Sequence, residues 1–533
     1  MEQLYYHGDI ITMENEQDHP ESIFVRNGII AAVGTLEEMK QLAGPDTEMI
    51  DLNGHTLMPS FIDAHGHVSL TTDGTTMADL SVAKSFDDVV RILKEFQEAN
   101  RIPEGEPIFG SGYDHTFLKE FAHPTREVLD RVSAVSPICI WHNSQHMCVI
   151  NSPLLDLMGI TEESEDPKGG TIGRAEGDKR PSGYLEESAT FPLRRYQMQF
   201  PGNLEQQIYD GQMVYARQGI TTVQDGATII NSFRSLKKMA NEGRLFLDIV
   251  SYISLMIEEV DDILDQNEDR IDHYINHFKI GGVKAVLDGS PQGKSAWMTK
   301  PYENSGDYCG YRWMKDDVLI PSYRKSLDRN LQILTHCNGD AAADQMLDAY
   351  EKAYRESMNP YKEKLRPVMI HCQTVRDDQL DRMPDLHMIP SIFVDHVNFW
   401  GDIHLQNLGE ARAHHISPVK AAMDRNLVYN FHTDTPVIQP NLLHTVWTAV
   451  NRLTSGGVVL GEDQKISAFD ALKGITINAA FEYGEETTKG SIKPGKRADL
   501  VILSENPLKI DPMMIKDITV LQTIKDGNTV YQA

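Results

Sequence analysis

The sequence lacks the features that mark secreted and membrane-spanning proteins. Its five cysteines are an odd number scattered over 533 residues, unlike the dense pattern of a disulfide-stapled domain. The first residues show no basic start followed by a long apolar core, so we expect no secretory signal. The longest apolar run, Ile249 to Ile257, contains two serines and falls short of the ~18 residues of a membrane span. We therefore expect a soluble, cytoplasmic protein that does not bind membranes.

Basic residues are also scarce. The chain has 50 Lys and Arg against 78 Asp and Glu, which gives a formal net charge of -28. Such a charge repels phosphate backbones and anionic lipid surfaces. Nucleic acid is excluded as a partner on this ground, and a small-molecule substrate is expected instead.

Both ends of the chain alternate short apolar runs with tight turns. Asn27-Gly28 and Asn53-Gly54 separate such runs near the start, and Asp526-Gly527 separates two near the end. Dipeptides of this kind between apolar runs indicate β-hairpins. Neither end has enough strands to cover its own apolar face, so residues 1–58 and 484–533 are predicted to form one small β-sandwich.

The middle of the chain, residues 59–483, alternates apolar strand-like runs with amphipathic helical stretches. Strands are expected at 61–67, 220–225, 246–254, 283–287, 332–336, 367–371, 389–394 and 427–432. Helices are expected at 204–218, 229–240, 260–275, 317–329, 341–354, 376–382 and 419–424. Eight strands joined by helices predict an α/β fold, the TIM (β/α)8 barrel.

One connection is far longer than the others. Residues 68–219 separate the first two expected strands and contain apolar strand-like runs of their own. A stretch of this length is predicted to be an inserted subdomain rather than a loop. Because it follows a strand of the barrel, it should emerge at the carboxyl face and act as a cap over the active site. Tyr113-Asp114-His115 is expected to line this cap.

A histidine pair, His65 and His67, closes the first expected barrel strand. Two imidazoles two positions apart on a strand point to the same face and form half of a metal site. Alone, such a pair is more often two half-exposed histidines. Here further ligand-type residues end other strands, namely Lys284, His336, His371 and Asp434. Four imidazoles and a carboxylate at the carboxyl face suit zinc or a similar divalent ion with a position left for water.

Six segments carry a resemblance to a known family. They read PSFIDAHGH at 59–67, VKAVLDGS at 283–290, THCNGD at 335–340, IHCQ at 370–373, HTDTPV at 432–437 and GSIKPGKRADL at 490–500. Their order and spacing resemble the amidohydrolase superfamily, and within it amidohydrolase family 3, the branch of N-substituted formamide deformylase-like metal-dependent hydrolases. The resemblance covers nearly the whole chain.

The resemblance implies roles for individual residues. Lys284 matches a lysine that can be carboxylated to a carbamate, N6-carboxylysine, that bridges two metal ions. An unmodified Lys284 in a single-metal site is the alternative, and Lys279 is the nearest competing lysine. His146 and His396 match substrate-facing positions, although a structural role is about as plausible for each, and His432 is a candidate to support a ligand. The resemblance also implies a homo-oligomer, which is usual in the family.

The expected chemistry is hydrolysis of a nonpeptide, amide-type C–N bond. A divalent ion lowers the pKa of a water and polarises the substrate carbonyl. Asp434 is then the catalytic residue that takes a proton from water and delivers it to the leaving amine. Hydrolysis of an ester or lactone, and deamination, are open alternatives, although Cys337-Asn338-Gly339 after His336 lacks the His-x-x-Glu of the deaminases. A metal-free scaffold or binding protein is a further alternative. The presence of ligand-type residues at all six positions is evidence against it.

Overall fold

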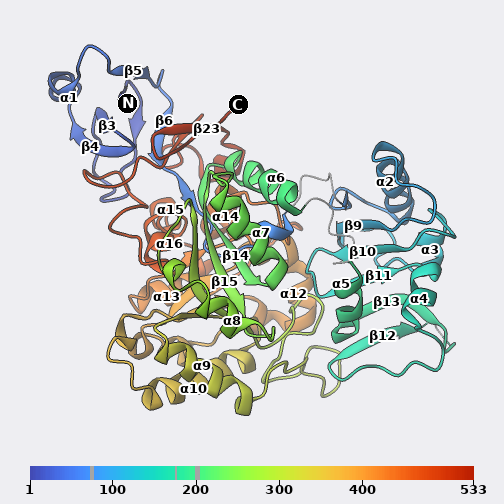
Figure 1. Ribbon diagram of the computed structural model, residues 1–533. Helices are drawn as coiled ribbons and strands as arrows, with labels where there is room; N and C mark the ends of the chain where they lie inside the picture. The colour runs from blue at the N-terminus through green and yellow to red at the C-terminus, as the bar shows by residue number, and fades with distance from the viewer. Residues whose placement is uncertain (72–76, 175–176, 198–203) are drawn as a thin grey trace. The chain divides into compact units, whose positions relative to one another are not determined.

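The computed structural model describes residues 1–71, 77–174, 177–197 and 204–533 (Figure 1). They divide into two compact units. The first contains Met1–Val68, Gln212–Thr435 and Gln439–Ala533, and the second contains Ser69–Gly211 and Pro436–Ile438. Among the described residues, no helix combines the length and apolar character that crossing a bilayer would need.

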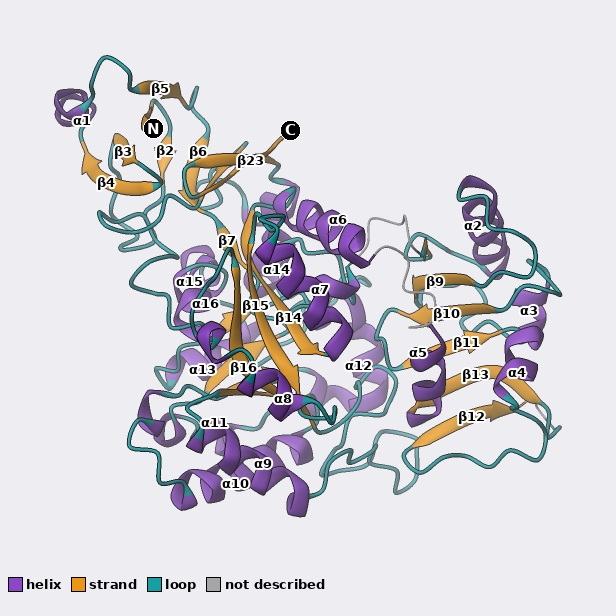
Figure 2. Ribbon diagram, viewed as in Figure 1, coloured by secondary structure: helices purple, strands orange, loops and turns teal. Residues whose placement is uncertain are grey.

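The first unit is built on an eight-stranded parallel sheet, whose strands β14, β15 and β16 run side by side in Figure 2. Each strand pairs with the next along the chain, so the TIM-barrel-like α/β fold predicted from the sequence is confirmed. All eight expected strands are present, with boundaries that differ by several residues. They are β7 Phe61–Ile62, β14 Ile220–Thr228, β15 Asp248–Ser254, β16 Phe278–Val286, β17 Gln332–Cys337, β18 Val368–His371, β19 Ile389–Ile392 and β20 Asn430–Phe431.

The sheet's two end strands, β20 and β7, are joined by hydrogen bonds just beyond the strands. The Asp434 N–H donates to the His65 carbonyl at 3.0 Å, and the His67 N–H donates to the Thr435 carbonyl at 2.8 Å. The carboxylate of Asp63 accepts the Thr433 N–H at 3.1 Å. This seam completes the ring and fixes the segments after β7 and β20 side by side.

Helices connect the strands as expected for parallel pairing. They are α6 Leu204–Ala216, α7 Ile230–Asn241, α8 Val260–Asp265, α9 Asp316–Asp328, α10 Asp340–Glu356, α11 Asp377–Leu380, α12 His396–Ala413 and α13 Val419–Asp424. After β20 come α14 Leu442–Asn451, α15 Ala468–Gly474 and α16 Ile477–Glu482. From α16 and the residue after it, Ala479, Ala480 and Tyr483 pack with Ile62 and Val250 in a buried apolar cluster.

One helix prediction is wrong, and one helix was not predicted. The helix expected over 260–275 ends at Asp265, because the chain turns through a short 3-10 segment, Glu268–Arg270, and Ile271 then bridges to Ile280 of β16. The helix α12 was not expected, because its buried stripe includes the polar or small residues His396, Gly401, His404 and Asn407, and Gly409, with φ 74°, interrupts its regular geometry.

Strands from both chain ends form two further sheets in the first unit. The four-stranded sheet has the order β4-β3-β1-β5, and the five-stranded sheet has the order β2-β6-β21-β22-β23. N-terminal β6 pairs antiparallel with C-terminal β21, and Leu57 and Leu500 belong to the same buried apolar cluster. The strands are β1 Glu2–Tyr6, β2 Asp9–Ile10, β3 Ser22–Arg26, β4 Ile29–Gly34, β5 Glu48–Asp51, β6 Thr56–Pro59, β21 Leu500–Leu503, β22 Val520–Lys525 and β23 Asn528–Gln532, and helix α1 is Leu36–Leu42.

The second unit has a six-stranded sheet of its own, in the order β12-β13-β11-β10-β9-β8. Alternate residues of its strands enter two different apolar clusters, so Ile138 and Ile140 lie in one and Cys139 and Trp141 in the other. The elements are β8 Ala78–Asp79, β9 Ile108–Tyr113, β10 Ile138–His142, β11 Met147–Ile150, β12 Gly170–Arg174, β13 Pro181–Glu187, α2 Phe86–Ala99, α3 Arg126–Asp130, α4 Ser152–Met158 and α5 Phe191–Gln197.

Candidate metal centre

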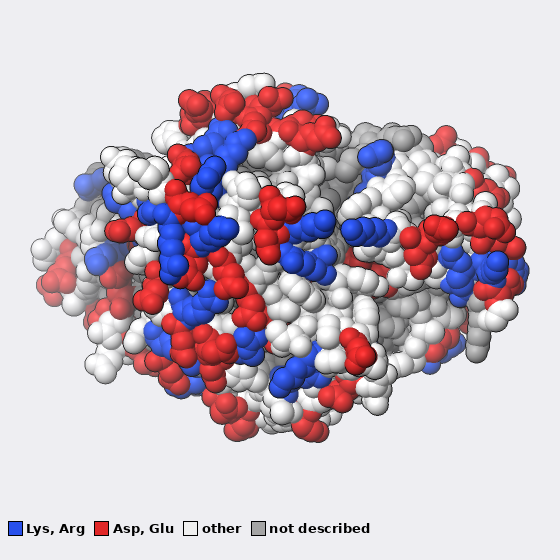
Figure 3. Space-filling model, turned by 90° about the horizontal axis from the view of Figure 1, so that it is seen from below, with Lys and Arg blue, Asp and Glu red and all other residues white. Residues whose placement is uncertain are grey.

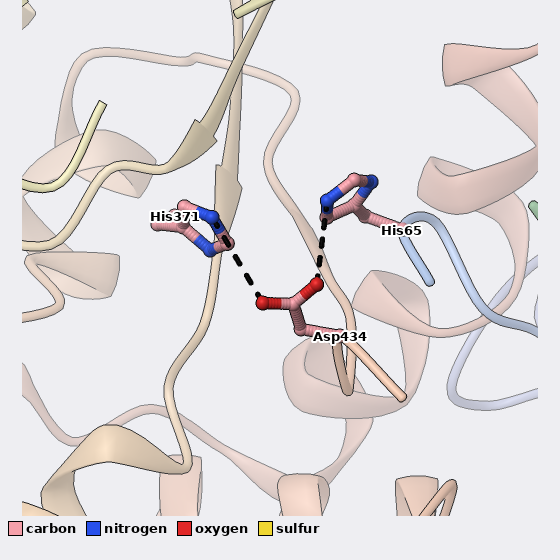
Figure 4. Close-up of side chains that lie close together, drawn as sticks. All are labelled: His65, His371 and Asp434. Atoms are coloured by element: carbon pink, nitrogen blue, oxygen red, sulfur yellow. Dashed lines mark ion pairs between the residues drawn. The ribbon is translucent and has the colours of Figure 1, made fainter. Parts of the chain in front are cut away.

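His65, His371 and Asp434 lie together at the carboxyl ends of the barrel strands. Figure 4 shows the Asp434 carboxylate between the two imidazoles, with one oxygen toward each ring. The Oδ1 atom is 3.4 Å from His65 Nε2, and Oδ2 is 4.0 Å from His371 Nε2. His67 Nε2 also approaches Oδ1, at 3.2 Å. The seam between β20 and β7 creates this group, because it holds the backbone of Asp434 against that of His65.

The histidine pair does not lie on a strand, as the sequence had led us to expect. Strand β7 ends at Ile62, and both histidines follow it in a loop. Their ring centroids are nevertheless 5.1 Å apart. The hydrogen bonds across the seam, rather than the alternation of a strand, keep the two rings on one side.

Both rings of the pair are oriented through their Nδ1 atoms. His67 Nδ1 lies 2.7 Å from the carbonyl oxygen of Gly226, which can only accept. His65 Nδ1 lies 2.5 Å from Gln224 Oε1, and Gln224 Nε2 donates to the Ala64 carbonyl at 2.7 Å. Each Nδ1 therefore carries the proton, and each Nε2 presents a lone pair. Acceptors behind metal-binding histidines fix the same tautomer in metalloproteins.

In these tautomers, neither His65 nor His67 offers an N–H group to Asp434 Oδ1. Within the described part of the chain, this buried oxygen has no hydrogen-bond partner. Its close neighbours are the Nε2 lone pairs of His65 and His67, which repel a carboxylate oxygen. A cation among the three atoms would turn this repulsion into coordination, so the donor set fits a divalent metal ion.

His336 and His371 bring two further nitrogens to the group. His336 Nδ1 is 2.9 Å from His371 Nε2. The far side of His336 faces the Gly289 carbonyl at 3.2 Å, and the far side of His371 faces His432 Nε2 at 3.2 Å. Burial lowers the pKa of His371 and His65 well below the usual range, and that of His432 to about 3. The imidazoles of His65, His371 and His432 are therefore neutral near pH 7.

Lys284 lies 3.1 Å from His65 Nε2 and is completely enclosed. Burial lowers the pKa of its amine to about 7, although Asp434 opposes the shift. The competing Lys279 instead forms salt bridges with Glu485 at 2.8 Å and Asp272 at 3.1 Å. The structure thus places Lys284, and not Lys279, beside the histidines.

Two of the grouped residues have left-handed backbones. His371 has φ 73° and Asp434 has φ 55°, and Cys372 next to His371 has φ 49°. Residues other than glycine adopt this region at a cost of order 1–3 kcal/mol, and such residues gather at functional sites. In both segments the conformation occurs where the chain leaves a barrel strand and a ligand-type side chain joins the group.

The two histidines matched to substrate-facing positions have different surroundings. His396 begins α12 and is buried, with its Nδ1 3.1 Å from His404 Nε2 and its ring 4.7 Å from that of Phe393. Burial holds the pKa of His396 well below the usual range. His146 belongs to the second unit, where its Nδ1 lies 3.0 Å from Glu187 Oε2.

Sequence reasoning overlooked the residues that orient the ligands. Asp288 is fully buried and accepts the N–H groups of Asn338 and Gly339 at 3.0 and 2.7 Å, while one oxygen lies 3.4 Å from His336 Nε2. Asp288 lies in the segment 283–290 that resembles the family, which was a usable signal. No sequence signal pointed to Gln224 or to the Gly226 carbonyl, because only the fold brings them behind the histidines.

Gln224→Leu should weaken metal binding by about 10–100-fold, because His65 Nδ1 loses the acceptor that fixes its tautomer. Equilibrium dialysis against zinc, with metal analysis of the protein, measures the change. Gln212→Leu is the matched control, because Gln212 is also buried but its Oε1 accepts the Phe246 N–H at 2.8 Å, away from the histidines. Equal affinity losses in the two variants would contradict the orienting role.

Comparisons with known proteins agree with this architecture. A family model described as "Amidohydrolase family" matches residues 48–531. An N-substituted formamide deformylase of Arthrobacter pascens is 27% identical over 550 residues, which cover 99% of this chain and 98% of that protein. Two crystal structures, each described as an uncharacterized metal-dependent hydrolase, also match. That from Pyrococcus furiosus is 24% identical over 96% of this chain and 100% of its own, with a TM-score of 0.75. That from Pyrococcus horikoshii OT3 is 25% identical over 96% and 99%, also with a TM-score of 0.75.

Proposed function

The chain belongs to the amidohydrolase family, and on this premise we propose that it is a metal-dependent hydrolase of a nonpeptide C–N bond in a small molecule. The observation that carries the proposal is the buried Asp434 Oδ1, which faces the Nε2 lone pairs of His65 and His67. This arrangement is stable with a cation among the three atoms and unfavourable without one.

The proposed ligands are the six residues singled out in the sequence: His65, His67, Lys284, His336, His371 and Asp434. Imidazole and carboxylate donors suit zinc, and the number of donors leaves room for one or two ions. Once bound, such an ion supplies a Lewis acid and lowers the pKa of water toward ~7.

Asp434 is the proposed proton carrier. Its carboxylate lies among the imidazoles, and no hydrogen-bond donor of the described residues engages Oδ1. It can therefore accept a proton from the attacking water and return it to the nitrogen of the leaving amine. The C–N bond then breaks without a covalent enzyme intermediate. His396, which packs on Phe393, and His146 of the second unit are proposed to contact the substrate.

A carbamate on Lys284 forms part of the proposal. The amine must be neutral to attack carbon dioxide, and enclosure already lowers its pKa to about 7. The new N–C bond forms as the nitrogen loses a proton, and the product is an anionic ligand beside His65. Labelling with 13C-bicarbonate in the presence of zinc should give one carbamate signal in the 13C NMR spectrum. Lys284→Met should abolish that signal and Lys279→Met should not; a signal that survives in Lys284→Met would contradict the assignment.

The proposed substrate class is based on a relative whose name, N-substituted formamide deformylase, states its substrate. We propose amide-type substrates and keep esters and lactones as the second choice, because an activated water attacks any of these carbonyls. A deaminase is disfavoured, since Cys337-Asn338-Gly339 follows His336. The insertion, residues 68–219 in the sequence prediction, is proposed to act as the specificity-setting cap, and the strands of both chain ends as one β-sandwich domain.

We propose no nucleic-acid partner. Lysine and arginine side chains are interspersed with aspartate and glutamate over the face in Figure 3, without a continuous basic stripe on it. The net charge of -28 disfavours phosphate polymers in the same way. A homo-oligomer in the cytoplasm stays a prediction that sedimentation and localisation can test.

A substrate screen tests the proposal directly. The chelator-treated protein is reloaded with zinc, manganese or cobalt and offered N-acyl, formamide, hydantoin, ester and lactone compounds. We expect release of an amine from an amide-type compound, lost on chelation and restored by metal. Preferential ester or lactone turnover would move the assignment to the second choice. A protein that holds less than about half an equivalent of divalent ion after reloading would support the metal-free scaffold instead.

A further inference from the structure

A second group of ligand-type side chains lies in the inserted unit, at the carboxyl ends of two adjacent parallel strands. Asp114 and His115 directly follow β9, and His142 is the last residue of β10. Because parallel neighbours end at the same edge of a sheet, the three side chains meet there. All belong to the unit that contains Ser69–Gly211, so the group is formed without any residue of the barrel.

The three donor atoms have the spacing of a metal site. His142 Nε2 is 3.2 Å from His115 Nδ1 and 3.6 Å from Asp114 Oδ1, and His115 Nδ1 is 3.8 Å from the same oxygen. A point in the plane of this triangle lies about 2.1 Å from each corner, and Zn–N and Zn–O bonds measure about 2.0–2.2 Å. An ion could bind without displacing a side chain.

The surroundings hold these side chains in place. The Asp114 carboxylate accepts the Thr116 N–H and hydroxyl at 2.8 and 2.7 Å on one oxygen, and the Asn143 amide at 2.8 Å on the other. On the far side of His142, Ser144 Oγ lies 2.9 Å from Nδ1. The Ser144 N–H also donates to this Nδ1, at 3.1 Å. These two contacts hold the ring so that its Nε2 faces His115 and Asp114.

The group is largely enclosed. His142 is fully buried, and the side chain of His115 is 20% exposed. Beside the group, Asn143 Oδ1 is buried and has no hydrogen-bond partner in the described part of the chain. It is an acceptor that a water on a bound ion could satisfy.

We propose that Asp114, His115 and His142 bind a second divalent metal ion of the zinc class, separate from the barrel centre. Two imidazoles and one carboxylate form a three-ligand set with an open fourth position. The ion would tie the loop after β9 to the end of β10 and so brace this edge of the sheet. No bond of the substrate is assigned to it.

The test removes the barrel centre and asks whether an ion remains. The full-length His65→Asn/His67→Asn variant is treated with chelator, dialysed against zinc and analysed for metal. One equivalent per chain is expected to stay bound. Adding His115→Gln, a change at a partly exposed residue, should remove that equivalent. Because two of the six proposed barrel ligands are replaced throughout, loss of the equivalent on adding His115→Gln assigns it to the group in the inserted unit and not to the remaining barrel ligands. This result does not depend on the proposed hydrolase function.

His146→Gln in the same background is the matched control, since His146 is a partly buried histidine of the same unit whose Nδ1 lies 3.0 Å from Glu187 Oε2, outside the group of Asp114, His115 and His142. It should retain the equivalent of zinc. If the barrel variant fails to fold, the wild-type barrel is used instead, and His115→Gln in that background should lower the zinc content by one equivalent. Zinc-edge anomalous scattering from crystals of the wild-type protein should also place an ion between His115 and His142. No bound zinc in the folded barrel variant, or zinc that persists with His115→Gln, overturns the proposal.

Discussion

Asp434→Asn is expected to lower kcat by about 10²–10⁴-fold on the best substrate of the screen, the range that loss of a general acid–base group produces. The amide keeps the size of the carboxylate but cannot accept a proton from water. Because Oδ1 forms no hydrogen bond in the described part of the chain, the folded structure loses little when the charge is removed. The melting temperature of the metal-depleted protein should therefore change little.

Metal analysis must accompany the kinetics of Asp434→Asn. Asp434 is both proposed ligand and proton carrier, so the variant is assayed at zinc concentrations that restore full occupancy of the barrel centre. A kcat that recovers to the wild-type value at full occupancy would leave Asp434 as a ligand only. A kcat that stays low at full occupancy supports proton transfer, and an unchanged kcat at every concentration would refute both roles.

Asp248→Asn is expected to have the largest effect on stability, about 3–5 kcal/mol, as for other buried charge pairs that lose one partner. Asp248 begins β15 and is buried, with Lys489 Nζ 2.6 Å and Lys525 Nζ 3.0 Å from one oxygen and His277 Nδ1 2.7 Å from the other. The amide would remove the one carboxylate that the two enclosed ammonium groups share, and leave Lys489 with Glu485 and Lys525 with Asp499 and Asp526. Thermal unfolding should shift down by roughly 3–6 °C, while kcat at low temperature is kept.

The surface pair Asp9–Lys509 provides the matched control. Asp9→Asn also removes an aspartate that joins the two chain ends, with Lys509 Nζ 2.7 Å away, but the two side chains are 36% and 64% exposed. Exposed pairs contribute about 0–1 kcal/mol. Equal losses of stability in Asp9→Asn and Asp248→Asn would show that burial of the network contributes nothing.

The same network predicts the response to acid. Burial alone would raise the pKa of Asp248, but Lys489 and Lys525 outweigh it and hold that pKa well below the usual range. A carboxyl whose pKa is lowered by folding stabilises the protein above its unfolded-state value of about 3.9, and the contribution disappears as the pH falls toward the folded-state value. Wild type and Asp248→Asn should therefore differ most near neutral pH and converge in strong acid.

The barrel strands could be predicted from the sequence because buried parallel strands consist of continuous apolar runs. Runs such as 246–254 and 367–371 predicted β15 and β18 within two residues. Helices were harder to predict: α8 stops at Asp265 because its continuation bridges to β16, and the buried face of α12 includes polar residues such as His404 and Asn407. Such choices depend on neighbours that are remote in sequence.

The sequence by itself determined the barrel strands and which imidazole, amine and carboxylate groups end them, because apolar periodicity and residue chemistry are local properties. It did not determine why His65 and His67 face Asp434, since neither histidine lies on a strand. The tertiary structure decided that through two backbone hydrogen bonds across the seam and through Gln224 and Gly226 behind the rings. Proton positions and close approaches of this kind depend on atoms that only folding brings into contact.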